Sequence, residues 1–187
     1  MGPEDIATLL VGAFAGAACS FLNTVASSGS AVSLPILMAV GLSPLMANAT
    51  NRVPVLIGAM AAAVQFWRKG HIEIPLALKV CLPVTLGAVL GTLYAEALPS
   101  RDMGLIITAS VMTALLLLFT KVKSALETIQ ALPTQFGIRE FVLLFAIGAW
   151  LGFIVLDGAT YLLMALVLSA HVPLVQANAL KNVALVP

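Results

Sequence analysis

The sequence contains very little charge. Of its 187 residues, 9 are Lys or Arg and 8 are Asp or Glu, and the formal net charge is +1. A soluble domain usually carries about 25% charged residues, so a charged fraction of 9% cannot cover the surface of a water-soluble protein of this size. The near-neutral balance also provides no basic surface to hold a nucleic acid. Most soluble enzymes and nucleic-acid-binding proteins are therefore excluded.

Cysteines and cofactor motifs are equally scarce. The two cysteines, Cys19 and Cys81, lie in unrelated segments and form neither a metal-binding nor a disulfide framework. No Gly-x-x-x-x-Gly-Lys-Ser/Thr loop occurs, so the chain does not hydrolyse ATP by itself. We expect a protein with no cofactor and no bound metal.

Long apolar runs take the place of charge. Hydrophobic residues make up 61% of the chain, and its mean hydropathy is +1.09. Runs without Lys, Arg, Asp or Glu cover 6–51, 53–67, 80–95, 103–120, 141–156 and 158–180. A helix that crosses the bilayer needs about 20 apolar residues. The sequence therefore predicts an all-α, polytopic transmembrane helical bundle whose partner is the lipid bilayer.

The expected helices include two short ones. They cover 5–22, 31–41, 44–68, 75–98, 102–120, 139–156, 160–170 and 173 onward. The first uncharged run is too long for one crossing, and polar residues at 23–30 interrupt it. The last helix offers only the 15 residues 173–187, so we expect the chain to be a fragment of a longer protein. Basic residues in 68–71 and 121–139 place both of these loops in the cytoplasm.

Two stretches of the chain resemble each other. Gly-Ala-x-x-Gly occurs at 12–16 and 148–152, and Ala-Asn-Ala occurs at 47–49 and 177–179. A polar interruption separates the two motifs in each stretch, and a cation and an asparagine follow each triplet. We interpret the chain as a first transmembrane repeat (1–120), a cytoplasmic linker (121–138) and an incomplete second transmembrane repeat (139–187).

The number of crossings decides the symmetry of this repeat. If both short helices cross the membrane, an odd number of crossings separates the two copies, which are then antiparallel as in many secondary transporters. If the short helices are re-entrant, the copies are parallel. We favour the inverted repeat.

Three charged residues fall at membrane depth on the repeated segments, namely Arg52, Asp157 and Lys181. A charge at this depth is costly and marks a functional site by default. Arg52 can hold oxyanion oxygens with two hydrogen bonds, and Lys181 can act as a point charge. Snorkelling at a membrane interface is the alternative for both cations. Asp157 could carry a coupling proton, or could neutralise one of the cations.

Broken helices suit a small anion, because the N-terminus of a half-helix presents backbone N–H groups. Gly29 and Gly158 would let a ligand approach the backbone closely. The candidate anion-binding residues are Asn23, Ser28, Gly29, Ser30, Asn48, Thr50, Asn51, Arg52, Asn178, Lys181 and Asn182. As an alternative, the Ser, Thr and Asn side chains of the first interruption (23–30) could serve only to satisfy the unwound backbone.

Pairs of glycines four residues apart predict close helix packing. They are Gly12/Gly16, Gly87/Gly91 and Gly148/Gly152. These pairs carry no information about a substrate.

Several of these motifs together resemble the sulfite exporter TauE/SafE family. They are the glycine-spaced first helix, Gly41-Leu-Ser-Pro44, Ala47-Asn-Ala-Thr-Asn-Arg52, Phe66-Trp-Arg-Lys-Gly70 and Ala177-Asn-Ala-Leu-Lys181. The resemblance covers essentially the whole chain. It departs from the family at the first interruption, which reads Ser27-Ser-Gly-Ser30 where the family has a run of glycines.

The resemblance implies a multi-pass protein of the bacterial inner membrane that transports sulfur-containing oxyanions such as sulfite or organosulfonates. We therefore expect a secondary anion transporter, not an enzyme. A passive anion channel or a membrane assembly subunit is the alternative. An intramembrane hydrolase is less favoured, because a serine enzyme needs a histidine within reach and Asp157 is the only intramembrane aspartate.

Overall fold

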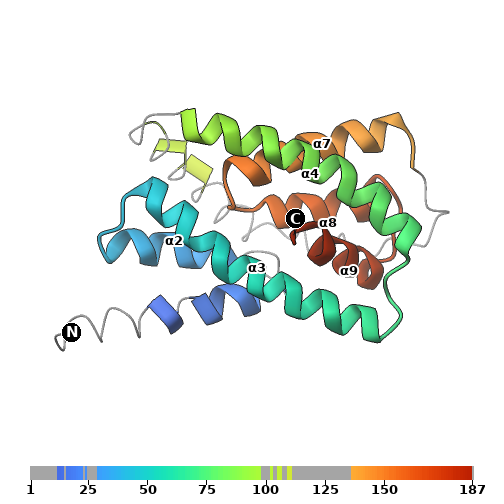
Figure 1. The fold of residues 1–187 in the computed structure, drawn as a ribbon, viewed down its shortest axis with the longest axis horizontal. Coiled ribbons are helices and arrows are strands. Elements are labelled where there is room, and N and C mark those ends of the chain that lie inside the picture. Colours follow the sequence, from blue (N-terminus) through green and yellow to red (C-terminus); the bar gives the residue numbers. More distant parts are fainter. Residues whose placement is uncertain are drawn as a thin grey trace.

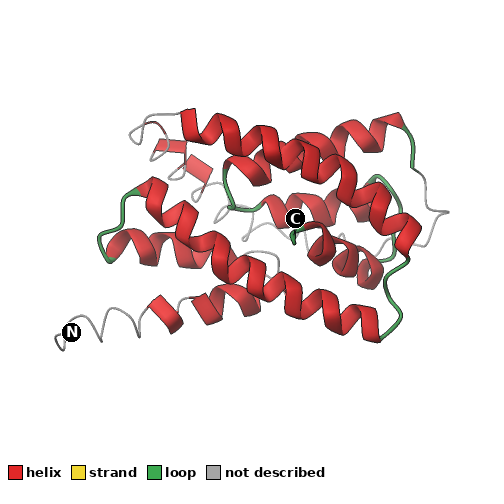
Figure 2. Cartoon of the chain, viewed as in Figure 1, coloured by secondary structure: helices red, strands yellow, loops and turns green. Residues whose placement is uncertain are grey.

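The computed structural model describes residues 12–14, 16–22, 24, 29–97, 102, 105–106, 109–110 and 136–186. All regular structure in these ranges is helical, as Figure 2 shows. The helices are Gly12–Leu22, α2 (Gly29–Ala39), α3 (Pro44–Arg68), α4 (Ile74–Ala97), α7 (Ile138–Phe153), α8 (Gly158–Leu168) and α9 (Leu174–Ala184). The predicted all-α fold is confirmed.

The helix boundaries agree closely with the sequence-based expectation. The expected helix at 44–68 matches α3 at both ends, and the other expected helices in the fully described ranges start and end within three residues of α2, α4, α7, α8 and α9. Most of the helix expected at 102–120, and most of the linker at 121–138, lie outside the described residues.

Local sequence signals explain where α3 begins and ends. Ser43 is its N-cap and accepts the backbone N–H of Met46 at 3.4 Å, and Pro44 occupies the first helical position. At the other end Gly70 has a φ of +73°, a left-handed conformation that costs glycine little. The backbone N–H of His71 then bonds to the carbonyl of Phe66 at 3.0 Å, which closes the helix.

Figure 1 shows the directions in which the helices run. The Gly12–Leu22 helix and α3 run from left to right in this view, whereas α2 and α4 return from right to left. In the second half α7 and α9 run from right to left, and α8 runs from left to right. The first helix of each predicted copy therefore points the opposite way from its counterpart.

The most extensive helix–helix contact joins α4 and α7, and glycines line it. A Cβ atom added at Gly91 would overlap the carbonyl oxygen of Ala149, and one at Gly152 would overlap that of Ala88. Gly87 and Gly148 meet the opposite backbone in the same way. These two predicted glycine pairs pack against each other, since only glycine allows the two backbones to approach so closely.

The third predicted glycine pair does not make such a contact. A Cβ atom at Gly12 would meet no described atom within 4 Å, and one at Gly16 would lie at an ordinary 3.5 Å from Pro54. The expectation of close packing through Gly12 and Gly16 is therefore wrong for the described part of the chain. Both glycines instead line a pocket beside α3.

The outer surface of the bundle is apolar. α4 exposes leucines on one side, including Leu78, Leu82 and Leu86, while its opposite side is buried against α7. A helix that is apolar all round suits a lipid environment. Among the described residues, α4 (Ile74–Ala97) is the one helix that is both long enough and apolar enough to cross a membrane. α3 is one residue longer, but it is less apolar because several polar side chains lie near its start.

Two main clusters of buried residues form the interior. The larger one joins α4, α7, α8 and α9, with Val84, Leu144 and Leu162 at its centre. The smaller one joins α2, the start of α3 and the end of α4 to the segment between α7 and α8. This second cluster brings the polar start of α3 against the interruption between α7 and α8.

Candidate anion-binding site

The interruption between α7 and α8 is held by an asparagine from the first half of the chain. Residues 154–157 are not helical. Asn48 of α3 donates a hydrogen bond from Nδ2 to the carbonyl of Phe153 at 3.3 Å, and its Oδ1 accepts the N–H of Val155 at 3.2 Å. The Asn48 side chain thus supplies hydrogen-bond partners for a backbone carbonyl and a backbone N–H where the helix is broken.

A second asparagine, one turn further along α3, holds the start of α2. Asn51 is fully buried and donates from Nδ2 to Ser30 Oγ at 2.8 Å. Its Oδ1 accepts hydrogen bonds from the hydroxyl of Ser33 and, at 3.4 Å, from the thiol of Cys19. One amide therefore ties together the Gly12–Leu22 helix, α2 and α3.

The second half of the chain contributes an amide to the first half. Asn178 of α9 donates from Nδ2 to the carbonyl of Thr24 at 3.4 Å. Asn48 and Asn178 are the central residues of the two Ala-Asn-Ala triplets. Asn48 therefore bonds to the backbone at the end of α7, and Asn178 bonds to the backbone just after the Gly12–Leu22 helix. Each asparagine thus contacts the other of the two similar stretches.

Arg52 lies at the same junction. Its Nη2 donates to the carbonyl oxygen of Gly152, close to the end of α7. Thr92 of α4 donates to the same oxygen at 3.1 Å. One backbone carbonyl therefore brings together α3, α4 and α7 at the guanidinium group, and Arg52 itself is half-buried.

Asp157 occupies a strained position at the start of α8. It is the N-cap of that helix, with a left-handed φ of 56°, and only 8% of the residue is exposed. Its Oδ2 atom has no hydrogen-bond partner among the described residues. A buried carboxylate oxygen needs a proton, a water molecule or another donor, so Asp157 stays a candidate site residue.

Lys181 and Asn182 lie on α9 and are fully buried. Asn182 donates from Nδ2 to the carbonyl of Asn178 at 2.9 Å, one turn earlier, and its Oδ1 has no partner within the described part of the chain. α9 packs against α3, so the two cation-bearing helices of the two predicted copies are in contact.

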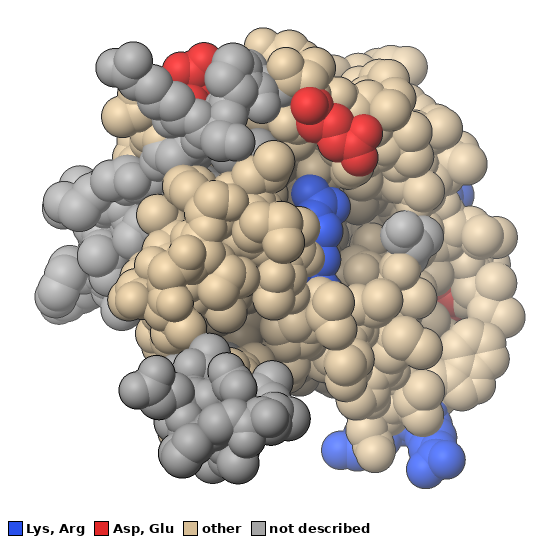
Figure 3. Space-filling model, turned by 60° about the vertical axis from the view of Figure 1, so that its left-hand side comes forward, with Lys and Arg blue, Asp and Glu red and all other residues tan. Residues whose placement is uncertain are grey.

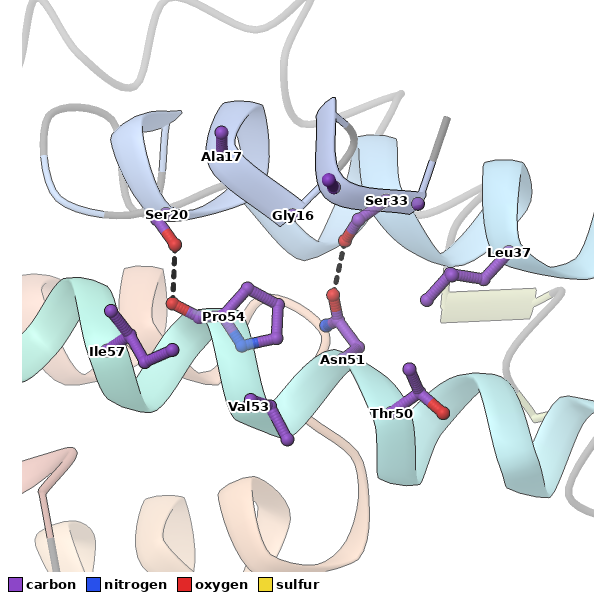
Figure 4. Close-up of a pocket in the computed structure, with 12 residues that line it drawn as sticks. Gly16, Ala17, Ser20, Ser33, Leu37, Thr50, Asn51, Val53, Pro54 and Ile57 are labelled. Atoms are coloured by element: carbon purple, nitrogen blue, oxygen red, sulfur yellow. Dashed lines mark hydrogen bonds between the residues drawn. The ribbon is translucent and has the colours of Figure 1, made fainter. Parts of the chain in front are cut away.

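A pocket of about 460 Å³ lies between the Gly12–Leu22 helix, α2 and α3. Figure 4 shows Ser20 and Ser33 pointing across the pocket toward α3. Ser33 donates to Asn51, and Ser20 donates to the carbonyl of Pro54. Most of the lining is apolar. Thr50 and Asn51 line this pocket, whereas Arg52, Asp157 and Lys181 do not.

The predicted site residues do not form one cluster: two groups lie around the start of α3, and Asn178, Lys181 and Asn182 lie on α9. Gly29, Ser30 and Asn51 meet at the first interruption, whereas Asn48 and Arg52 contact the backbone at the second. Thr50 is exposed, and Asn23 and Ser28 lie outside the described residues. Four further residues of these networks could not be predicted from the sequence: Cys19, Ser33, Thr92 and Trp150. The Nε1 of Trp150 donates to the carbonyl of Leu156 at 3.0 Å.

The apolar surface, the broken helices and the buried charges define this chain as a helical membrane protein. The family model that matches it is the one described as sulfite exporter TauE/SafE, over residues 11–187. The chain belongs to the sulfite exporter TauE/SafE family. No solved structure shows a significant match to it.

Two curated relatives carry transporter names. The chain is similar to the probable membrane transporter protein ORF9 of a Sinorhizobium species, with 32% identity over 94 residues, 50% of this chain and 35% of that protein. It is also similar to a probable membrane transporter protein of Haemophilus influenzae, with 31% identity over 83 residues, 44% of this chain and 32% of that protein. The matches therefore span about a third of the length of these relatives.

Proposed function

We propose that this chain forms part of a multi-pass secondary transporter of the bacterial inner membrane, which moves small sulfur-containing oxyanions such as sulfite or a sulfonate. The observation that carries this proposal is the contact between α3 and α9. It joins two helices that carry a half-buried Arg52 and a fully buried Lys181 inside a bundle with an apolar surface. Cations at such positions mark a functional site by default, and a small anion is a ligand of matching charge.

Arg52 is suited to bind and release such an anion. Its guanidinium group bonds to a neutral acceptor, the carbonyl of Gly152. A hydrogen bond to a charged oxygen is about twice as strong as one to a neutral oxygen, so an oxyanion can replace this carbonyl. Lys181 would add a point charge from α9, and the interrupted helices would add the positive ends of their dipoles.

Asp157 supplies a candidate for the coupling proton. Its carboxylate is buried next to the N-terminus of α8, where helix-dipole interactions favour negative charge, and one oxygen has no partner among the described residues. An anion bound nearby would repel this carboxylate, so the binding of the anion and of a proton would favour each other. This is the relation that anion–proton symport requires.

An inverted repeat is supported by two features of the fold. The helices of the two stretches run in opposite directions (Figure 1). Asn48 and Asn178 also make reciprocal hydrogen bonds to the opposite stretch. In this arrangement the anion would bind between the two copies, as substrates do in other transporters with inverted repeats.

The proposal is tested by flux into proteoliposomes that contain the full-length protein. We expect saturable uptake of sulfite and of methanesulfonate that an imposed pH gradient drives above the external concentration. Uptake that only equilibrates the two sides would instead indicate a passive channel. Uptake no faster than in protein-free liposomes would contradict anion transport and favour an assembly role.

A further inference from the structure

The residue that follows Thr92 by one helical turn on α4 is an acid, Glu96. Residues four apart lie on the same face of a helix. Since Thr92 and Arg52 both donate to the carbonyl of Gly152, this face of α4 is turned toward the guanidinium group. Glu96 lies one residue before the end of α4, at Ala97, and is exposed.

The charges of Glu96 and Arg52 are close enough to interact electrostatically. Figure 3 shows the end of the bundle at which α4 terminates, where a basic side chain lies in a hollow and an acidic side chain lies beside it. Uncharged residues line most of the described surface next to this hollow. Glu96 is thus an exposed acid on the face of α4 that Thr92 turns toward Arg52, one residue before the helix ends.

We propose that Glu96 is the resident counter-ion of Arg52, and that an incoming oxyanion binds Arg52 by displacing Glu96. This inference rests on the proposed function. Glu96 is a positioning residue: its charge attracts the guanidinium group while the site is empty, and the same charge opposes the approach of an anion to Arg52.

The competition has a direct consequence for affinity. A binding-competent state that is only partly populated weakens the apparent affinity by its fraction. Removing the carboxylate should therefore tighten anion binding, whereas damage to the fold would weaken it. An exposed ion pair is weak, so the expected change is about two- to fivefold.

The test measures sulfite binding to the full-length protein in nanodiscs by isothermal titration calorimetry. We expect Glu96→Gln to lower the Kd for sulfite about two- to fivefold. Glu96→Asp, which keeps the charge, should restore the wild-type value. The matched control is Glu73→Gln, because Glu73 is an exposed acid at the opposite end of α4.

Each outcome has a separate meaning. Unchanged or weaker binding by Glu96→Gln, or an equal tightening by Glu73→Gln, would overturn the role of Glu96 while leaving the anion site intact. If the wild-type protein does not bind sulfite, or if Arg52→Gln binds it as well as wild type does, the proposed function itself fails.

Discussion

The side-chain oxygen of Asn48 on α3 accepts the backbone N–H of Val155 at 3.2 Å, across 107 positions of sequence. The same side chain donates to the carbonyl of Phe153. A helix that breaks inside an apolar bundle leaves backbone groups without partners, and each such group is costly in surroundings that lack water. Asn48 therefore fixes where α7 ends and sets the position of Asp157, two residues after Val155.

Replacing Asn48 should lower the stability of the protein itself, and not only its affinity for an anion. Asn48→Ala leaves the buried N–H of Val155 and the part-buried carbonyl of Phe153 without this partner, and the loss of a partner costs a buried group about 1–3 kcal/mol. We expect a lower midpoint of thermal unfolding in detergent. Gln65→Ala is the control, since Gln65 is exposed on the same helix. Equal midpoints for the two variants would show that Asn48 does not support the interruption.

The contact between α4 and α7 should not tolerate a single added methyl group. Gly91→Ala would place a Cβ atom onto the carbonyl oxygen of Ala149, so the two helices must move apart. Overpacking of this kind costs about 1–3 kcal/mol or more. Gly12→Ala, where a Cβ atom meets no described atom within 4 Å, is the control. A Gly91→Ala variant as thermostable as Gly12→Ala in detergent would contradict this packing.

Asp157 offers a way to separate charge from backbone conformation. Asparagine tolerates the left-handed φ of 56° that this position requires, whereas alanine does not. We expect Asp157→Asn to fold like wild type but to lose uptake driven by a pH gradient. Asp157→Ala should in addition be less stable by about 1 kcal/mol. Proton-driven uptake that persists in Asp157→Asn would clear this residue of the coupling role.

Most of the fold could be predicted because its determinants are local. Uncharged runs located the helices, and Ser43-Pro44 and Gly70 marked the ends of α3. The spacing of Gly87 and Gly91 indicated close packing, although it could not identify α7 as the partner. These signals act through the backbone conformation of nearby residues, so they can be read without knowledge of the tertiary structure.

The hydrogen-bond network at the candidate site could not be predicted in this way. Thr92 and Cys19 are small polar residues in apolar runs, where a helix accepts them without consequence. Their partners, Gly152 and Asn51, lie 60 and 32 positions away, so only the fold brings them together. Asn48 satisfies an interrupted backbone, and its role as an anion ligand stays a prediction.

The predicted topology can be tested with single cysteines at the two ends of α3. In a background with Cys19→Ala and Cys81→Ala, we expect Lys69→Cys to react with a membrane-impermeant maleimide only from the cytoplasmic side, because this loop is basic. Val40→Cys, in the loop before α3, should react only from the other side. Both positions are exposed. Labelling of both cysteines from one side would contradict a crossing by α3.

The central claim is that Arg52 and Lys181 bind the transported anion. Its most direct test is sulfite uptake into proteoliposomes by Arg52→Gln and Lys181→Gln, with Lys79→Gln as the control, since Lys79 is an exposed lysine on α4. Size-exclusion profiles in detergent establish that all three variants fold. We expect each of the two site variants to lose at least about 90% of the uptake rate, because each removes a cation of the site and a buried ionic contact contributes several kcal/mol, whereas Lys79→Gln should transport like wild type. Undiminished uptake by both site variants would contradict the account.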